Sequence, residues 1–333
     1  MSAHTSGGWQ PSATLEVLRL RARMLAGIRA FFSERDVLEV ETPCLSAAAT
    51  PDPALLSFTT RYTGPLYPQG QTLYLQTSPE FPMKRLLAAG SGSIYQICKV
   101  FRDGEAGRMH NPEFTLLEWY RTGFDAARLM AEVESLVRQL LGGHMLLAAS
   151  EKLSYREAFQ QHAHLDPHAA TARDFARVAR AHEIHAPPDM LMHHDVAIWR
   201  DLLLTHLIEP RLGQGRLTFL YDYPASQASL ARVRPGNPPL AERFELYLNG
   251  VELANGFHEL ADASEQRTRF ERQLHARSAE HLPPVPLDEN LLAALASGLP
   301  DCSGVALGFD RLAMLAAGAK SLGEAIAFPV DCA

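Results

Sequence analysis

The sequence predicts an α+β fold in which helices flank an antiparallel β-sheet. Residues 93–103 and 114–123 are rich in β-branched and aromatic side chains and enclose one loop, as in a long-looped hairpin. A second hairpin is expected over 241–260, because Asn249-Gly250 stands where a type I′ turn needs such residues. Residues 14–35 place apolar side chains at helical spacing, which predicts an amphipathic helix.

Local signals predict the elements that surround the first helix. Residues 1–13 are expected to form a disordered tail. Residues 37–46 (VLEVETPCLS) are typical of a short strand, which Pro43 ends. A further strand is expected over 73–77. Ser78-Pro79 then provides an N-cap and a first helical residue for a helix that extends to about residue 89.

The rest of the chain continues without a linker or an internal repeat. Asp125 caps a helix that reaches about residue 141, and 145–215 is expected to be a largely helical insertion. A strand over 216–224 and the second hairpin follow. Because the composition is even, we expect one domain over 14–333. The last elements are helices over 263–280 and 288–297, and one that begins near Phe309.

The insertion contains several histidines, for which a metal site is one interpretation. No cysteine accompanies them, and no HExxH-type pair lies on one helix face, so histidines at the surface and at helix caps are the favoured alternative. These residues are His162, His164, His168, His182, His185, His193 and His194.

Composition restricts the class of protein. The 333 residues are 47% hydrophobic, which is ample for a core, and the net charge is −7 without a run of basic residues. This balance argues against a large nucleic-acid partner. No signal peptide and no membrane-spanning run is present, so we expect a soluble, cytoplasmic protein. The widely spaced cysteines indicate reduced thiols, at Cys44, Cys98, Cys302 and Cys332.

The loop of the first hairpin is unusual for a structural turn. It places Arg102, Arg108 and His110 close together in the sequence, with Phe114 directly after them. Cationic donors beside an aromatic ring suit a nucleotide, because the cations hold phosphates and the ring stacks on a base. A solvated, charged loop is the alternative that spacing alone leaves open.

The exact residues of three segments are more specific than the spacing of their charged side chains. FRDGEAGRMHNPEFTLLEWY (101–120) resembles motif 2 of class II aminoacyl-tRNA synthetases, in the lysyl branch. GVALGFDR (304–311) resembles motif 3, and GVELANGFHEL (250–260) resembles the strand that carries metal-binding carboxylates in that family. The first helix and the strand with Pro43 resemble motif 1, which implies a homodimer.

The resemblance implies an ATP site that uses Mg²⁺. Arg102 would bridge the substrate carboxylate and the α-phosphate, and Arg108 and His110 would meet the outer phosphates. Phe114 and Arg311 would enclose the adenine, with Arg102 and Arg311 as the catalytic residues. Further ATP contacts are implied for Glu105, Asn111, Leu253 and Gly308. The family has glutamate where this chain has Gly104, and its acid follows one residue later as Glu105.

Glu252 and Glu259 are the implied metal ligands and also ATP and substrate contacts, respectively. They are seven residues apart, so a regular strand would point them to opposite faces. We therefore expect a bulge between them, at Asn255-Gly256.

The resemblance also implies a pocket for a cationic amino acid. Glu118 and Tyr120 share a strand face and match the residues that receive the lysine ammonium in the lysyl branch. A glutamate paired to a structural Arg or Lys is the alternative from sequence alone. The other implied substrate contacts are Ser78, Glu80, Asn255, Glu259 and Ala306, and Ala306 stands where the tRNA enzymes have glycine.

Some fourteen residues precede motif 1, too few for the OB-fold that binds the anticodon in lysyl-tRNA synthetases. The chain therefore resembles the free-standing paralogues that activate (R)-β-lysine with ATP and join it to a lysine of elongation factor P. This implies a ligase with elongation factor P as its partner and makes tRNA an unlikely one. The alternatives are a truncated synthetase that charges tRNA, an amide-forming relative similar to asparagine synthetase, and a catalytically silent paralogue that binds a ligand.

Overall fold

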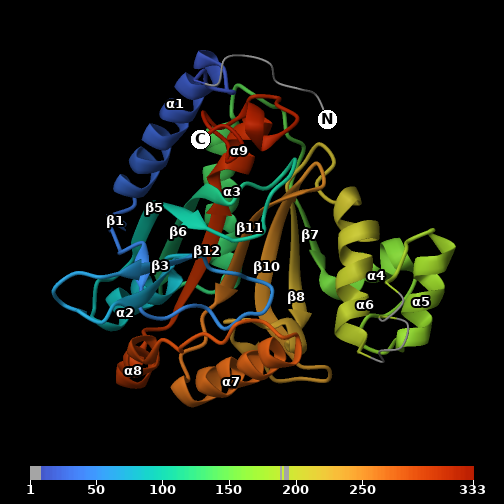
Figure 1. Ribbon diagram of the computed structural model, residues 1–333. Coiled ribbons are helices and arrows are strands. Elements are labelled where there is room, and N and C mark those ends of the chain that lie inside the picture. The colour runs from blue at the N-terminus through green and yellow to red at the C-terminus, as the bar shows by residue number, and fades with distance from the viewer. Residues whose placement is uncertain (1–8, 188–189, 191–194) are drawn as a thin grey trace. The chain divides into compact units, whose positions relative to one another are not determined.

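The computed structural model describes residues 9–187, 190 and 195–333, and has the α+β architecture that the sequence predicts (Figure 1). The first eight residues of the expected tail, and His193 and His194, lie outside the described residues. The chain divides into two compact units. The first comprises residues 1–123, 261–301 and 306–333, and the second comprises 124–260 and 302–305. The single domain expected over 14–333 stays a prediction.

The first unit contains the predicted hairpin of β5 (Ile94–Phe101) and β6 (Glu113–Thr122), which pair antiparallel. β1 (Leu38–Glu39) pairs parallel with β5, so this edge departs from the antiparallel pattern. The strand expected over 37–46 is in fact two short strands on either side of Pro43. The second of them joins a separate sheet, whose order is β2 (Leu45–Ser46), β4 (Gln71–Leu75) and β3 (Thr59–Tyr62).

Helices of the first unit begin close to the expected residues. The helix after Ser78 begins one residue later than predicted, at Glu80, and Pro79 is its N-cap residue. The Ser78 hydroxyl accepts a hydrogen bond from the Glu80 amide, in a local turn and not as the N-cap. The bounds are α1 (Leu15–Ser33), α2 (Glu80–Ala88), α7 (Ala263–Ala279), α8 (Glu289–Gly298), α9 (Phe309–Ala316) and the 3₁₀ turn Leu322–Glu324.

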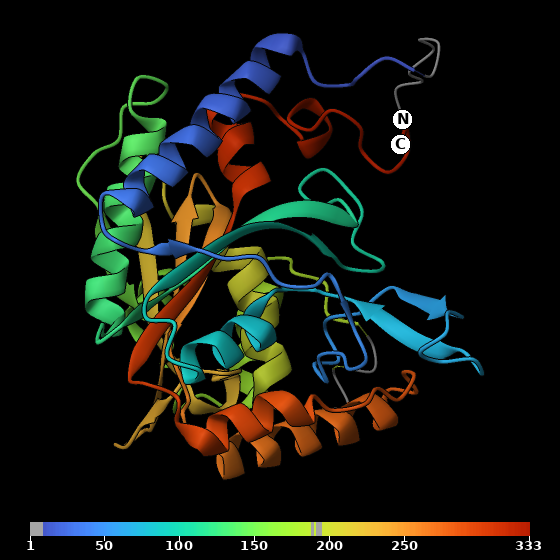
Figure 2. The same cartoon turned by 90° about the vertical axis from the view of Figure 1, so that its left-hand side faces the viewer.

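The β5–β6 hairpin has one face that packs against the protein and one that carries the predicted site residues. On the packing face, Tyr95 stacks on Phe32 of α1 with ring centroids 4.4 Å apart, and Trp119 meets the same ring edge-on at 5.4 Å. All three side chains are buried. Figure 2 shows α1, in blue, lying across these strands. The amphipathic helix predicted over 14–35 therefore supports the hairpin from behind.

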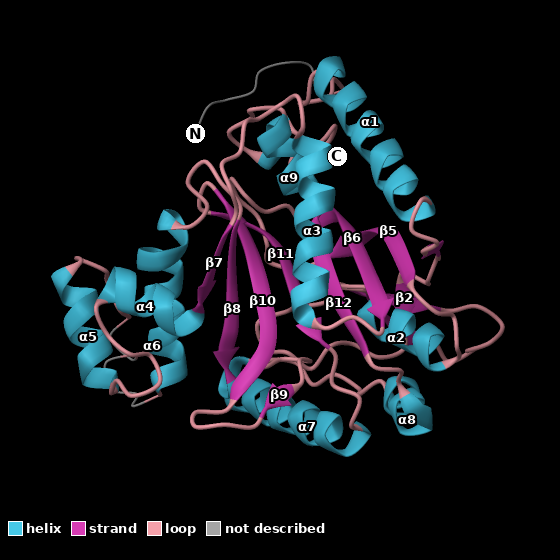
Figure 3. Cartoon of the chain, turned by 180° about the vertical axis from the view of Figure 1, so that it is seen from behind, coloured by secondary structure: helices cyan, strands magenta, loops and turns pink. Residues whose placement is uncertain are grey.

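The second unit contains the predicted second hairpin, β10 (Leu240–Leu248) and β11 (Val251–His258), seen from behind in Figure 3. Asn249 and Gly250 both have positive φ, +52° and +73°, as a type I′ turn requires. β8 (Thr218–Pro224) pairs antiparallel with β10, and β7 (Glu151–Ser154) pairs parallel with β8. The short β9 (Val233–Arg234) also pairs with β10, and β12 (Cys302–Gly308) begins in this unit.

The insertion over 145–215 is mostly helical, although it also supplies β7. Its core forms where Tyr155 stacks on Phe159, with ring centroids 4.7 Å apart, beside the buried Trp199. Ser154 and Glu157 form a capping box at the start of its first helix. The helices of the second unit are α3 (Ala126–Leu141), α4 (Tyr155–Ala163), α5 (Ala172–Ala181), α6 (Val196–Leu203), the π-turn Leu204–Ile208, and the 3₁₀ turns Glu209–Arg211 and Ala225–Gln227.

Two kinds of feature are absent from the described residues. No group of three or more His, Cys, Asp or Glu side chains there is arranged to hold a metal ion. None of the helices in the same parts of the chain is long and apolar enough to cross a membrane.

Candidate active site

One face of the β5–β6 hairpin carries three predicted site residues, all of them on β6. Phe114, Glu118 and Tyr120 lie at even spacing on β6, and Gln96 is directly opposite Glu118 on β5. Arg102 directly follows β5, and its amide donates to the Pro112 carbonyl at 2.8 Å. The hairpin thus brings the predicted phosphate-binding arginine onto the same element as the predicted amino-acid pocket.

Arg102 is held loosely at the end of its strand. Its guanidinium carbon lies 5.0 Å from the centroid of the Phe114 ring, and Nε lies 3.4 Å from the Thr77 carbonyl oxygen. An ion pair at 3.6 Å joins it to Glu105. Because each of these contacts is long or partly exposed, the arginine is able to turn toward an anion at small cost.

The loop between the strands takes its shape from glycines. Gly104 has a φ of +80°, a conformation that side chains other than glycine rarely adopt. This explains why the family's glutamate is absent from that position and why the acid follows as Glu105. Asn111 is buried. Its side-chain amide donates to the Glu113 carbonyl at 2.6 Å and its oxygen accepts from the Val330 amide at 3.0 Å, so it fixes the loop. The Arg108 side chain is exposed.

Arg311, in the first turn of α9 as predicted, meets the same loop. Its Nη2 lies 2.8 Å from Nε2 of His110, and its Nε donates to the Met109 carbonyl at 3.3 Å. Arginine only donates, so Nε2 of His110 accepts and the ring is neutral in this contact. Burial, and next the charge of Arg311, lower the pKa of His110. At neutral pH the histidine therefore adds no charge. The loop itself contributes two cations, Arg102 and Arg108, in place of the three that were expected, and Arg311 of α9 adds another beside it.

The predicted amino-acid pocket contains a buried carboxylate with hydroxyl donors. Glu118 is 2% exposed. The hydroxyl of Tyr120 donates to its Oε1 at 2.6 Å, and the hydroxyl of Ser78 donates to its Oε2 at 2.8 Å. The two hydroxyls orient the oxygens of this carboxylate, and a carboxylate held in this way suits an ammonium group as a ligand.

Glu80 has a partner that the sequence analysis missed. Lys84, one helical turn further along α2, places its Nζ 2.7 Å from Oε1 of Glu80 and is 1% exposed. The i,i+4 spacing of the two residues is the signal that would have found this pair. Glu80 therefore neutralises the buried ammonium of Lys84 in the structure. A substrate amino group bound here would share the Glu80 carboxylate with Lys84.

The predicted metal carboxylates belong to the second unit, where Glu252 lies on β11 and Glu259 directly follows this strand. The register places Glu252 opposite Tyr247 and Ala254 opposite Leu246, so Leu253 is an extra residue in the strand. This bulge reverses the alternation and puts Glu252 on the same face as Asn255 and Glu259. The predicted break is confirmed in its effect, but its expected position at Asn255-Gly256 is wrong.

Gly256 serves packing and not the bulge. A Cβ at this position would lie 2.4 Å from the ring of Phe244, which is fully buried. Glycine therefore allows β10 and β11 to stay in regular register here.

Glu245 is a third carboxylate on the face that carries Glu252 and Glu259, and the sequence analysis missed it. It lies directly opposite Asn255 on β10 and is 6% exposed. The hydroxyls of Tyr223 and Tyr247 both donate to its Oε2 at 2.5 Å, and Arg243 donates to its Oε1. Carboxylate oxygens are the ligands that Mg²⁺ prefers, although the described carboxylates are not arranged as a metal-binding cluster and the oxygens of Glu245 already accept three hydrogen bonds.

The comparison with known proteins identifies the family of the chain. The family of class II tRNA synthetases for aspartate, lysine and asparagine (D, K and N) matches residues 9–332. The chain belongs to the class II aminoacyl-tRNA synthetase family. This class II chain is similar to proteins named elongation factor P–(R)-β-lysine ligase. Identity is 53% to the proteins from two Klebsiella pneumoniae strains and 52% to that from Salmonella paratyphi B, over 97% of this chain and 98% of each relative. The predicted resemblance is therefore confirmed.

Motif 3 of this class II chain is anchored by an aspartate that was not singled out in the sequence. Asp310 is 2% exposed, and its carboxylate accepts from the Thr115 amide of β6 at 2.7 Å and from Arg21 of α1 at 2.5 Å. These bonds fix the start of α9 against the hairpin and so position Arg311. Ala306 and Gly308, both partly exposed, lie two residues apart on β12.

Proposed function

We propose that this protein is an ATP-dependent ligase that activates (R)-β-lysine, or lysine, and transfers it to a lysine side chain of elongation factor P. In the first step a carboxylate oxygen of the amino acid attacks the α-phosphorus of ATP, and pyrophosphate leaves. In the second step the acceptor amine attacks the carbonyl of the mixed anhydride, and AMP leaves. A ligase that modifies a translation factor would act in the cytoplasm.

The observation that carries this proposal is the buried carboxylate of Glu118, held by the hydroxyls of Ser78 and Tyr120 on the hairpin that also carries Arg102. The pocket suits an ammonium group, and the arginine suits the two anions that react. The names of the relatives support the choice of acceptor and of amino acid. Catalysis of this kind is mainly positioning and charge neutralisation, which these residues supply.

We assign the remaining roles as follows. Arg102 bridges the reacting carboxylate and the α-phosphate, and Arg311 stabilises the nucleotide from α9. The other ATP contacts are Glu105, Arg108, His110, Asn111, Phe114, Glu252, Leu253 and Gly308. The other amino-acid contacts are Ser78, Glu80, Tyr120, Asn255, Glu259 and Ala306.

ATP–pyrophosphate exchange with the purified protein tests the proposal. Exchange is expected without tRNA, and fastest with (R)-β-lysine when it is compared with (S)-β-lysine and α-lysine. Transfer of labelled amino acid to elongation factor P is the second readout. A preference for α-lysine with transfer to tRNA would support a synthetase instead, and no exchange with any lysine would contradict adenylation.

We propose that Glu252 and Glu259 bind Mg²⁺, which when bound neutralises phosphate charge. Replacing either by glutamine is expected to raise the Mg²⁺ concentration for half-maximal exchange by about tenfold or more, since one charged ligand is lost. Glu245→Gln tests the third carboxylate of that face. Glu242→Gln is the control, because Glu242 pairs with Arg232 at 2.5 Å and lies 3.4 Å from Nδ1 of His258. Equal Mg²⁺ dependence in all four variants would exclude this face as the metal site.

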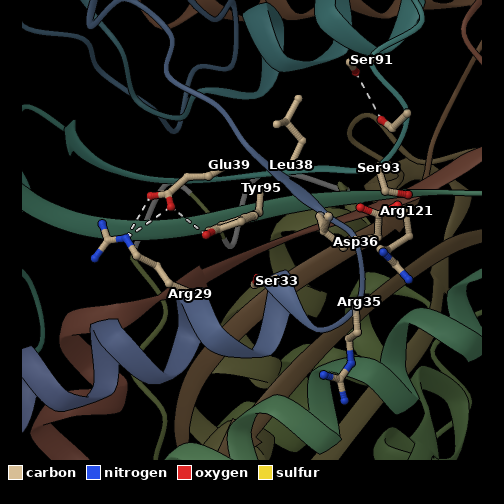
Figure 4. A pocket seen from close by; sticks show the side chains of 12 residues that line it. Arg29, Ser33, Arg35, Asp36, Leu38, Glu39, Ser91, Ser93, Tyr95 and Arg121 are labelled. Carbon is tan, nitrogen blue, oxygen red and sulfur yellow. Dashed lines mark hydrogen bonds and ion pairs between the residues drawn. The ribbon is translucent and has the colours of Figure 1, made fainter.

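We propose a homodimer that forms through α1 and β1. Leu38 on β1 is 56% exposed, and within the described residues β1 pairs with β5 alone. Beside it is a pocket of about 800 Å³, shown in Figure 4, where Glu39 accepts from Arg29 at 3.1 Å and from Tyr95 at 2.7 Å. β1 thus lies at a sheet edge and has an exposed apolar side chain, which a second copy of the chain is able to cover.

Light scattering after size exclusion tests the dimer. Leu38→Asp is expected to convert a dimer into a monomer, because it places a charge where apolar contact is needed. Leu66→Asp is the matched control, since Leu66 is 80% exposed on the β3–β4 loop, away from β1. A wild-type monomer, or a dimer that survives Leu38→Asp, would contradict the proposed interface.

A further inference from the structure

Arg243, on β10 of the second unit, contacts the side chain of Asn255 on β11. The distance from Arg243 Nε to Asn255 Oδ1 is 3.3 Å. The guanidinium carries only hydrogen-bond donors, so the atom of Asn255 that faces it must be the carbonyl oxygen. The amide nitrogen of Asn255 therefore points away from Arg243, with its hydrogens available to an acceptor.

The orientation of Arg243 is itself fixed on several sides. Nη1 donates to the Gln227 carbonyl at 2.9 Å, and Nη2 donates to Oε1 of Glu245 at 2.5 Å. The guanidinium also lies 4.4 Å from the centroid of the Tyr223 ring. Three nitrogens thus have three different partners, and the ring covers the plane of the group. Such a guanidinium has little freedom to turn.

The partners of Arg243 are restrained in turn. Glu245 accepts from the hydroxyls of both Tyr223 and Tyr247. Gln227 donates from its side chain to Asp201 of α6 at 2.5 Å, which ties the segment that holds Nη1 to the helical insertion. The network therefore connects the insertion to a single amide on β11.

We propose that Arg243 is a positioning residue, which orients the Asn255 amide so that its nitrogen donates to the carboxylate of the amino-acid substrate. This inference rests on the proposed function, in which Asn255 is an amino-acid contact. Without Arg243 the amide is able to rotate by half a turn, and its oxygen would then face the substrate carboxylate and repel it. Lysine does not replace arginine here, because one ammonium does not meet three partners set in a planar fork.

Exchange kinetics with the substitutions Arg243→Lys and Asn255→Ala, singly and together, test the coupling. Arg243→Lys is expected to raise the KM for the amino acid about tenfold, ~1.4 kcal/mol, and to leave the KM for ATP within about twofold. In the Asn255→Ala background the same substitution is expected to have no further effect on the amino-acid KM. A structural role alone would not produce this dependence on Asn255.

Asn255→Asp provides a second measurement that does not alter Arg243. The aspartate keeps an acceptor for Arg243 but has no hydrogen to donate, so the amino-acid KM is expected to rise while the melting temperature is kept. Arg234→Lys is the control, because Arg234 forms an exposed ion pair with Asp222 outside this network. The inference is overturned if Arg243→Lys leaves the amino-acid KM unchanged, or raises it equally with and without Asn255. Absence of exchange in the wild type would instead overturn the proposed function.

Discussion

Replacing Arg102 by lysine is expected to lower the rate of amino-acid-dependent ATP–pyrophosphate exchange by about 10²- to 10³-fold. Two anions must approach each other in the proposed reaction, and a planar fork is able to donate to both at once. A lysine keeps the charge but offers a single point donor. The loss is expected in kcat more than in KM, because the bridging contact is complete only when the carboxylate has reached the α-phosphate.

Lys99→Arg is the matched control for this substitution. Lys99 lies on the opposite face of β5 and pairs with Glu113 at 3.5 Å, so the exchange rate is expected to stay within about twofold. Arg102 forms only long or partly exposed contacts, so Arg102→Lys is expected to leave the melting temperature unchanged. An exchange rate that survives the substitution would exclude Arg102 as the bridging residue.

The elements that sequence predicts well depend on residues close together in the chain. Asn249-Gly250 determines a turn through the backbone preferences of those two residues, and the expected hairpin forms around it. Asp125 caps α3 through a bond to the amide of Arg128, three residues on. The shared face of Glu118 and Tyr120 follows from the alternation of a strand. Each of these inferences requires only local geometry, and each is found in the structure.

The parts that sequence did not predict depend on partners far away in the chain. Nothing near Asp310 indicates that its carboxylate will join β6 to α1. The bulge at Leu253 depends on the register of β11 against β10, and the sequence was compatible with an irregularity either there or at the glycine three residues later. Gly256 is instead required by the ring of Phe244. Such features are set by packing across strands, which a single sequence does not display.

The charge of the β5–β6 loop also depends on a residue far away in the chain. His110, two residues after Arg108, was expected to be a cation, yet it accepts a hydrogen bond from Arg311, and burial and then the charge of Arg311 lower its pKa. The fold therefore concentrates positive charge on arginines, whose charge is independent of pH near neutrality. If the loop binds phosphates as proposed, its attraction for them is expected to vary little with pH near neutrality.

Replacing Glu118 by glutamine is expected to raise the KM for lysine or β-lysine by about 10²-fold or more, since a buried charge–charge contact with the substrate ammonium is lost. Glutamine has nearly the same shape, and its oxygen still accepts from Ser78 or Tyr120, so the pocket is expected to persist. Tyr120→Phe removes one hydroxyl and keeps the charge, and about a tenfold rise is expected. A larger rise in KM for Glu118→Gln than for Tyr120→Phe would show that the charge of Glu118 matters more than its orientation.

Glu113→Gln is the control for this experiment. Glu113 begins the same strand on the opposite face and is half-exposed, so its neutralisation is expected to leave the amino-acid KM unchanged. Because the proposed pocket selects for a positive charge, the KM for an uncharged analogue of lysine is expected to fall relative to the KM for lysine in Glu118→Gln. If the variant instead kept its affinity for lysine, Glu118 would not bind the substrate ammonium, and a different carboxylate would have to take that role.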